Sequence, residues 1–167
     1  MNLLCCIPYR PNGNLGAAYN DFMSRLGDDD WAVFIDHDAA FTTPDWHKQL
    51  LQAIAAHPNA GLFTAKTNRI GNPMQRDTTV QGHDMRAHRA HGNTLTGRTS
   101  VTDVTGLPQL ISGVVMCLSK RTWERVGGFC NGFLGVDNDM HRKCMQAGLR
   151  VYILNGLYVY HWYRETL

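Results

Sequence analysis

The sequence lacks a long hydrophobic run. None of the apolar stretches in its 167 residues approaches the roughly 20 residues that a membrane-spanning helix needs. The segment Met1–Cys5 has no basic residues, and its apolar stretch is too short for a signal peptide. We therefore expect a cytoplasmic protein without a transmembrane segment.

Cysteine and net charge are also low. The five cysteines are odd in number and follow no disulfide framework spacing, which favours free buried thiols in a reducing compartment over disulfide bonds. The formal net charge of +2 neither requires nor excludes a polyanionic partner. The length suits one domain with a substantial core, because two ordinary domains would need more residues.

The most informative segment is Trp31–Asp38. Its apolar run predicts a strand buried on both faces, and Asp36 and Asp38 follow at its end. Side chains alternate along a strand, so both carboxylates point to the same side, at the edge where open α/β sheets bind ligands. Two such acids repel each other unless a cation or a proton lies between them. A polar strand end followed by an ordinary turn is the alternative.

The first part of the chain alternates strand and helix patterns. Strands are predicted at residues 3–7, 31–38 and 61–66, and helices at 15–26, capped by Asn14, and from Thr43 onward. This alternation predicts an α/β fold with a parallel sheet covered by helices. The loop before the first helix is either a phosphate-binding turn or an ordinary β–α connection.

Residues 67–110 show no regular periodicity and contain many glycine, asparagine and histidine residues. A segment of this length inside a compact domain is typical of a functional loop or of partial disorder. His83, His88 and His91 lie within it, but no C-x-x-C accompanies them and their spacing does not match a zinc site. We interpret the segment as a flexible, basic loop on the acceptor side.

The last third returns to regular patterns. A strand is predicted at 111–118, a helix from Ser119 to Val126, and a second helix that ends at Ala147 and has Asp137 at or near its start. Two short strands, 150–154 and 157–160, precede an aromatic and basic tail.

Several blocks together resemble the GT-A glycosyltransferases of family 2. The strand end Phe34–Asp38 is similar to the DxD motif of that family, and Asn14–Asn20 resembles the helix that precedes it. The blocks Ile111–Phe129 and Val136–Gly148 resemble the acceptor-side strand with its glycine-rich turn and the "ED-x-D-L … AG" helix. His161 is similar to the strand-end histidine that completes the metal site.

This resemblance implies a GT-A (Rossmann-like) α/β fold, with a mixed, mostly parallel sheet flanked by helices, as a single minimal domain over residues 1–167. It implies sugar transfer from a nucleotide-sugar donor, with a UDP-sugar expected. The same resemblance implies an inverting reaction in which Asp137 is the general base. Mn²⁺ or Mg²⁺ would be bound by Asp38 and His161, with Asp36 beside them. The donor would contact Pro8, Tyr9, Arg10, Asn14, Asp36, Gly113 and Arg164.

The sequence departs from the family pattern in two places. The second βα unit, which usually ends in a nucleobase-reading aspartate, is missing, and Val136 replaces the glutamate before the expected base. The sequence therefore resembles the short GT-A-like proteins of bacteria and their phages. It leaves open whether the acceptor is a glycan, a protein, a lipid or modified DNA, and it does not define the oligomeric state.

The chemistry of these residues is consistent with the resemblance. A divalent cation stabilises the diphosphate that leaves when a nucleotide-sugar bond breaks, and a carboxylate can take the proton of the attacking hydroxyl. Two alternatives use the same residues: a metal-dependent phosphohydrolase, and a non-catalytic module that binds a nucleotide or nucleic acid. The order Asp-His-Asp argues against the hydrolase, because metallophosphoesterases prefer an Asp-x-His start.

Overall fold

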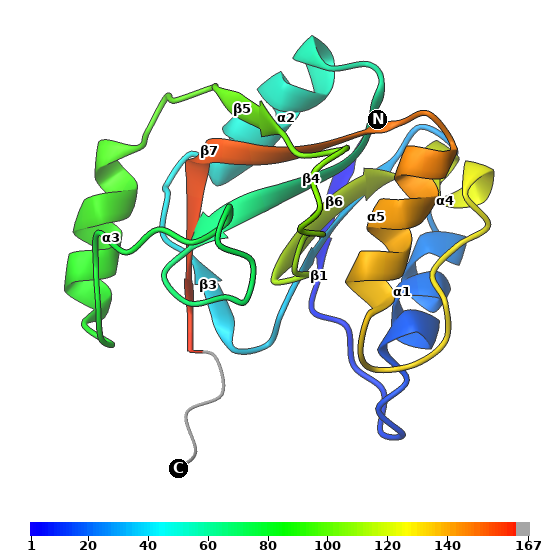
Figure 1. The fold of residues 1–167 in the computed structure, drawn as a ribbon, viewed down its shortest axis with the longest axis horizontal. Helices are drawn as coiled ribbons and strands as arrows, with labels where there is room; N and C mark the ends of the chain where they lie inside the picture. The colour runs from blue at the N-terminus through cyan, green and yellow to red at the C-terminus, as the bar shows by residue number, and fades with distance from the viewer. Residues whose placement is uncertain (163–167) are drawn as a thin grey trace.

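The computed structural model describes residues 1–162 and is built around one mixed sheet (Figure 1). The strand order is β1-β2-β6-β4-β7-β3, and β5 pairs with β7 outside this path. The strands are β1 (Leu3–Cys6), β2 (Trp31–Ile35), β3 (Ala39–Phe41), β4 (Ala60–Thr67), β5 (Val101–Asp103), β6 (Val115–Ser119) and β7 (Arg150–His161). The helices are α1 (Leu15–Ser24), α2 (Trp46–Ala56), α3 (Met85–Thr94), α4 (Lys120–Arg125) and α5 (Val136–Gln146).

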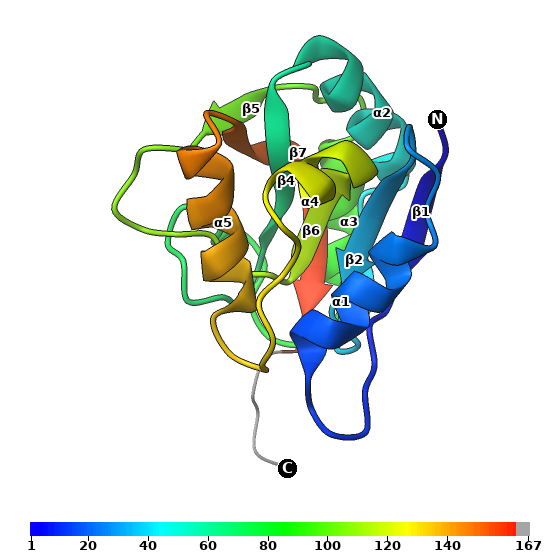
Figure 2. The same ribbon diagram turned by 90° about the vertical axis from the view of Figure 1, so that its right-hand side faces the viewer.

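Helices cover both faces of the sheet. Helices α1, α4 and α5 lie on one face and α2 on the other, whereas α3 lies beyond β7 (Figures 1 and 2). Strand β2 contributes to both cores: Phe34 packs with the α1 and α5 side, and Val33 packs with the α2 side. Both side chains are at most 1% exposed, which confirms the predicted strand buried on both faces. Within residues 1–162, no helix is long and apolar enough to cross a membrane.

The mixed α/β fold is confirmed, but the sheet has fewer parallel pairs than expected. Strands β1–β2 and β4–β7 pair in parallel, whereas β6 lies antiparallel between β2 and β4. The chain enters β6 at the edge where β2 ends, since Val115 pairs with Ile35. Strand β5 runs antiparallel to β7, and residues 104–114 bring the chain back to the edge where β2 ends, so β6 runs antiparallel to both of its neighbours.

Several predicted boundaries are wrong: the strand predicted from residue 111 begins at Val115, and two further differences have a clear physical cause. Helix α2 begins at Trp46, because the Thr43 hydroxyl donates to the Gly156 carbonyl and accepts from the Tyr158 amide instead of capping the helix. The two predicted final strands are one strand, β7, whose pairing with β4 jumps from Leu154 to Tyr158. The residues between these two partners form an irregularity at the place where the sequence predicts a break.

The 67–110 segment is more regular than its sequence predicts. It contains α3 and β5, and β5 extends the sheet by pairing with β7. Gln75 is fully buried and bonds to the hydroxyl of Thr64 and to both backbone groups of Ser112. Polar side chains thus fix this segment to the core where apolar periodicity is missing. Its mobility and its role toward an acceptor stay predictions.

Helix α1 is fixed to the turn that follows α4. The Asn14 side chain caps α1 by accepting from Ala17, and it also accepts from the amide of Gly132. The amide of Gly16 donates to the Gly132 carbonyl, and a Cβ on Gly16 would overlap the carbonyl oxygen of Cys130. The donors at this helix start are therefore used within the protein rather than for a phosphate.

We predict that Gly16→Ala lowers the free energy of unfolding by about 1–3 kcal/mol, the usual range for overpacking a tight contact. The added methyl group must push α1 away from Cys130. Urea denaturation measures this difference. Gly106→Ala is the matched control, because a Cβ there meets no atom within 4 Å, and equal stability losses in both variants would contradict the tight contact.

Candidate active site

A cavity of about 620 Å³ opens at the edge where β2 and β7 end. Its walls come from the loop after β1, the end of β2, residues 70–71, residues 112–114, residues 133–138 and His161. Asp36, Asp38, Asp137 and Gly113 all lie in these walls, so the structure brings together the residues on which the predicted chemistry depends.

Asp36, Asp38 and His161 form one cluster in this cavity. One potential ligand atom from each residue lies within 4.8 Å of the others. The His161 Nε2 atom is 3.3 Å from the Asp38 Oδ1 atom, and the His161 side chain is buried. Two carboxylates and an imidazole at this spacing are ligands that suit Mn²⁺ at least as well as Mg²⁺.

The pairing of β3 with β7 creates this cluster. Ala39 is the partner of His161 in the antiparallel register, and the Trp162 amide donates to the Asp38 carbonyl at 2.9 Å. Asp38 therefore lies beside His161, although the two residues come from distant parts of the chain. Asp36 joins them from the end of β2.

The hydrogen bond of the His161 ring defines its tautomer. The Nδ1 atom is 2.9 Å from the carbonyl oxygen of Arg69, which can only accept, so Nδ1 carries the proton. In the neutral ring, the Nε2 lone pair then faces the Asp38 carboxylate. A cation between the two atoms, or a proton on Nε2, would stabilise this contact, and a histidine whose other nitrogen donates to a carbonyl is typical of metal sites. The donor set fits a divalent cation.

Electrostatics within the cluster support the same interpretation. Burial raises the pKa of the Asp36 carboxyl to about 6; His161 acts in the opposite direction, and the Asp38 carboxylate adds to the rise. Negative charge is therefore destabilised at Asp36 while the cavity holds no cation. A bound divalent cation would reverse this balance.

Asp137 occupies the first turn of α5, which begins at Val136 after the left-handed Gly135. Its Oδ2 atom accepts from the Gly113 amide at 2.7 Å, and its Oδ1 atom accepts from the Asn138 amide at 2.8 Å. A Cβ on Gly113 would lie 2.9 Å from the Asp137 Cβ, so only glycine allows this close approach. Asp137 is not the N-cap itself, but its carboxylate is oriented by two backbone donors.

Two further residues of α5 hold the same wall, and sequence reasoning missed both. The side-chain amide of Asn138 donates to the Ile111 carbonyl at 2.8 Å, and the His141 Nδ1 atom accepts from the backbone amide of Ile111 at 3.1 Å. His141 is fully buried, and its Nε2 atom contacts the Thr105 carbonyl. Their spacing from Asp137 on one helix could have indicated that these residues act together. Their partner, Ile111, could not be identified without the fold.

The other predicted donor-site residues have different outcomes. Pro8, Tyr9 and Arg10 line the cavity, and Arg10 also forms an ion pair with Asp21. Asn14 is outside the cavity walls and is occupied as a helix cap. Arg164 lies outside the described residues.

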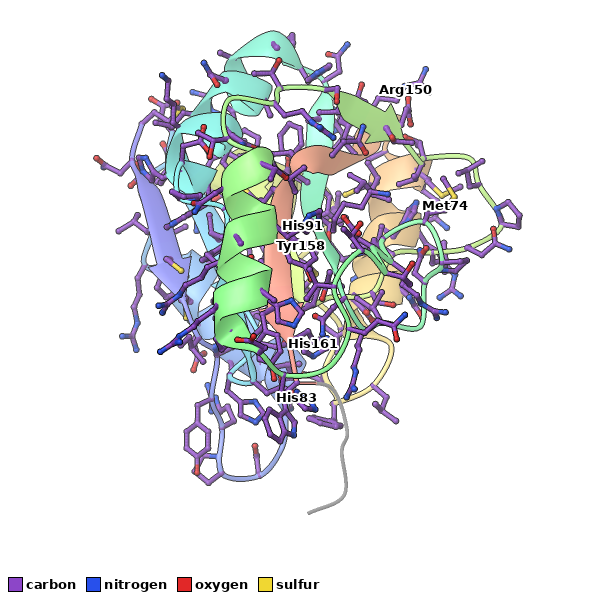
Figure 3. All side chains as sticks on the ribbon, turned by 90° about the vertical axis from the view of Figure 1, so that its left-hand side faces the viewer. Met74, His83, His91, Arg150, Tyr158 and His161 are labelled. Carbon is purple, nitrogen blue, oxygen red and sulfur yellow. The ribbon has the colours of Figure 1, made fainter. Side chains whose placement is uncertain are left out.

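The three histidines of the 67–110 segment lie outside the walls of the cavity. His83 and His88 bond to the hydroxyl groups of Tyr160 and Tyr158 on β7, and His91 bonds to Asp77 at 2.9 Å. Figure 3 shows His91 beside Tyr158, between α3 and β7. His88, through its bond to Tyr158, and His91, whose ring contacts the Tyr158 ring, attach α3 to β7.

Comparison with known proteins identifies a family. The sequence model of the family described as Glycosyl transferase family group 2 matches residues 31–167. The match begins at the first residue of β2 and includes the Asp36, Asp38, Asp137 and His161 positions. No curated protein matches the chain.

The burial of His141 generates a prediction about pH. Burial lowers the pKa of this imidazole, against the opposing effect of its bond to the Thr105 carbonyl. The unfolded chain takes up this proton near pH 6.5, whereas the folded chain resists it. The contribution of the neutral His141 ring to the free energy of unfolding is therefore fully present above that pH. It decreases as the pH falls through that value, by at most about 1.4 kcal/mol per pH unit.

The variant His141→Gln, which keeps an acceptor and a donor but does not titrate, should lose this acid sensitivity. Urea unfolding at pH 5 to 8 measures the stability difference between wild type and variant. His47→Gln, at an exposed position on α2, is the control. If the difference in unfolding free energy between wild type and His141→Gln does not change with pH, His141 is not the source of the acid sensitivity.

Proposed function

We propose a function for this chain from the premise that it belongs to glycosyl transferase family group 2 and is a glycosyltransferase. It transfers a sugar from a nucleotide-sugar donor to an acceptor hydroxyl, with a divalent cation bound by Asp36, Asp38 and His161. The observation that carries the proposal is the position of the His161 Nε2 atom, 3.3 Å from Asp38 Oδ1, in a ring whose Nδ1 proton is committed to the Arg69 carbonyl. We propose Mn²⁺ or Mg²⁺ as the cation.

The proposed cation would stabilise the leaving group. Breaking the bond between the sugar and the nucleotide leaves a diphosphate, and a divalent cation supplies Lewis-acid stabilisation of that charge. Asp38 and His161 would hold the cation, and Asp36 would complete the set or contact the donor's ribose. Tyr9 and Arg10 line the same cavity and would contact the nucleotide.

Asp137 is the proposed general base. Each of its oxygens accepts one backbone hydrogen bond and keeps a second lone pair that can accept the acceptor's hydroxyl proton. As that hydroxyl oxygen attacks the anomeric carbon, its proton moves to Asp137 and the diphosphate leaves with the electrons of the broken bond. This single displacement inverts the configuration of the sugar.

The acceptor would enter beside α5. Phe133 and Leu134 precede this helix, line the cavity and are 65% and 75% exposed. From the 67–110 segment, Ile70 and Gly71 line the same cavity. We propose that these four residues contact the acceptor. Within the 67–110 segment, the predicted acceptor contact is then limited to Ile70 and Gly71.

Turnover of a nucleotide-sugar panel tests the function directly. We expect at least one donor to release its nucleoside diphosphate with Mn²⁺ and an acceptor mixture, and EDTA to stop that release. In Asp38→Ala and His161→Ala, calorimetric titration should show weaker Mn²⁺ binding. His91→Ala is the control, because His91 belongs to a histidine–carboxylate pair outside the cavity. Turnover that is unaffected by EDTA would refute metal dependence.

For the base, we predict that Asp137→Asn lowers the transfer rate by about 10²- to 10⁴-fold, the usual contribution of base catalysis. An asparagine amide would also place a donor against one of the two backbone N–H groups, so thermal melting and donor affinity must be measured in the same variant. Asp139→Asn is the matched control, since Asp139 pairs with Lys143 at 2.8 Å and lies outside the cavity walls. A stable, fully active Asp137→Asn would exclude this residue as the base.

A further inference from the structure

We propose that Asn68 is a positioning residue. Its side-chain amide binds the backbone of His161 and so orients the His161 ring toward the cation site, an inference that rests on the proposed function. Asn68 belongs to the 67–110 segment and is not a wall residue of the cavity. Its side chain is nevertheless buried, with a residue exposure of 6%.

Two hydrogen bonds join the Asn68 amide to one residue. The Asn68 Oδ1 atom accepts from the His161 amide at 2.8 Å, and its Nδ2 atom donates to the His161 carbonyl at 3.2 Å. The Thr67 hydroxyl also donates to Oδ1, at 3.2 Å. Because a carboxamide carries a donor and an acceptor side by side, it matches the N–H and C=O of a strand residue as a neighbouring strand would.

This contact continues the β4–β7 ladder after the backbone of β4 has turned away. The last register pair between these strands is Thr67 with Val159, two residues before His161. Since both His161 backbone groups point to Asn68, the Ala39–His161 pair on the β3 side is a non-hydrogen-bonded pair, the kind in which side chains approach more closely. Asn68 thus binds the two backbone groups of His161 that point away from β3.

The next residue along the chain holds the ring. The Arg69 carbonyl accepts from His161 Nδ1 at 2.9 Å, so adjacent residues fix both the backbone and the imidazole of His161. Moving Asn68 would therefore also move the carbonyl that selects the tautomer. We infer that the start of the 67–110 segment prepares the cation site before substrate arrives.

Asn68→Ala tests this inference because it leaves the buried N–H and C=O of His161 without these partners. We expect Mn²⁺ affinity, measured by calorimetry without donor, to fall by about 10- to 100-fold, the usual cost of losing a group that orients a metal ligand. Asn72→Ala is the matched control. Asn72 is also buried, at 5%, and its amide bonds to Leu110 and Met74 instead of His161. It should lower stability but change Mn²⁺ affinity by less than about threefold.

A second measurement does not depend on metal or activity. In the metal-free protein at pH 8, the ¹⁵N spectrum of the His161 ring should show protonated Nδ1 in wild type and in Asn72→Ala. In Asn68→Ala we expect a mixture of both tautomers. If Asn68→Ala does not fold, Asn68→Asp keeps the acceptor for the His161 amide and loses the donor to its carbonyl, and its ring spectrum should show the same mixture.

The outcomes separate the two proposals. Wild-type affinity and a wild-type ring spectrum in Asn68→Ala would overturn the role of Asn68 while leaving the cation site intact. Equal losses of affinity in Asn68→Ala and Asn72→Ala would overturn it as well, because the effect would then be a general loss of stability. A wild-type protein that binds no Mn²⁺ would refute the proposed metal site, and the ring spectra would still decide whether Asn68 positions His161.

Discussion

The antiparallel pairing of β3 with β7 is the constraint on which the site depends. It places Ala39 opposite His161 and ties the Trp162 amide to the Asp38 carbonyl, so a carboxylate and an imidazole from opposite ends of the chain meet at one sheet edge. The Arg69 carbonyl commits the ring proton to the opposite side of the imidazole. When the ring is neutral, the contact between His161 Nε2 and the Asp38 carboxylate joins two acceptors, and a cation would stabilise it.

The opposite wall of the cavity depends on close approach rather than on pairing. Gly113 allows the Asp137 side chain to reach a backbone amide at 2.7 Å, and Asn138 and His141 of the same helix bind both backbone groups of Ile111. The start of α5 and the residues before β6 therefore form one unit. A carboxylate held in this way can face an acceptor without a large rearrangement of its own.

Local features of the sequence predicted much of this arrangement. The apolar run ending in Asp36 and Asp38 predicted β2 and the shared side of its acids, and Asn14 was predicted as a cap because its side chain satisfies an amide within its own helix. The contacts that finish the site are long-range. The sequence pattern of residues 67–110 contains no apolar period because Gln75, His88 and Asn68 attach the segment through buried hydrogen bonds, which periodicity does not reveal.

The position of a bound Mn²⁺ ion is the most direct test of the account. Substoichiometric Mn²⁺ added to ¹⁵N-labelled protein broadens the amide signals nearest to the ion. The account predicts that the signals of residues 36–39, Gly113 and residues 161–162 broaden first, that those of α2 stay sharp, and that EDTA restores all of them. Broadening centred on Asp77 and His91, or no selective broadening, would contradict a cation site built by the pairing of β3 with β7.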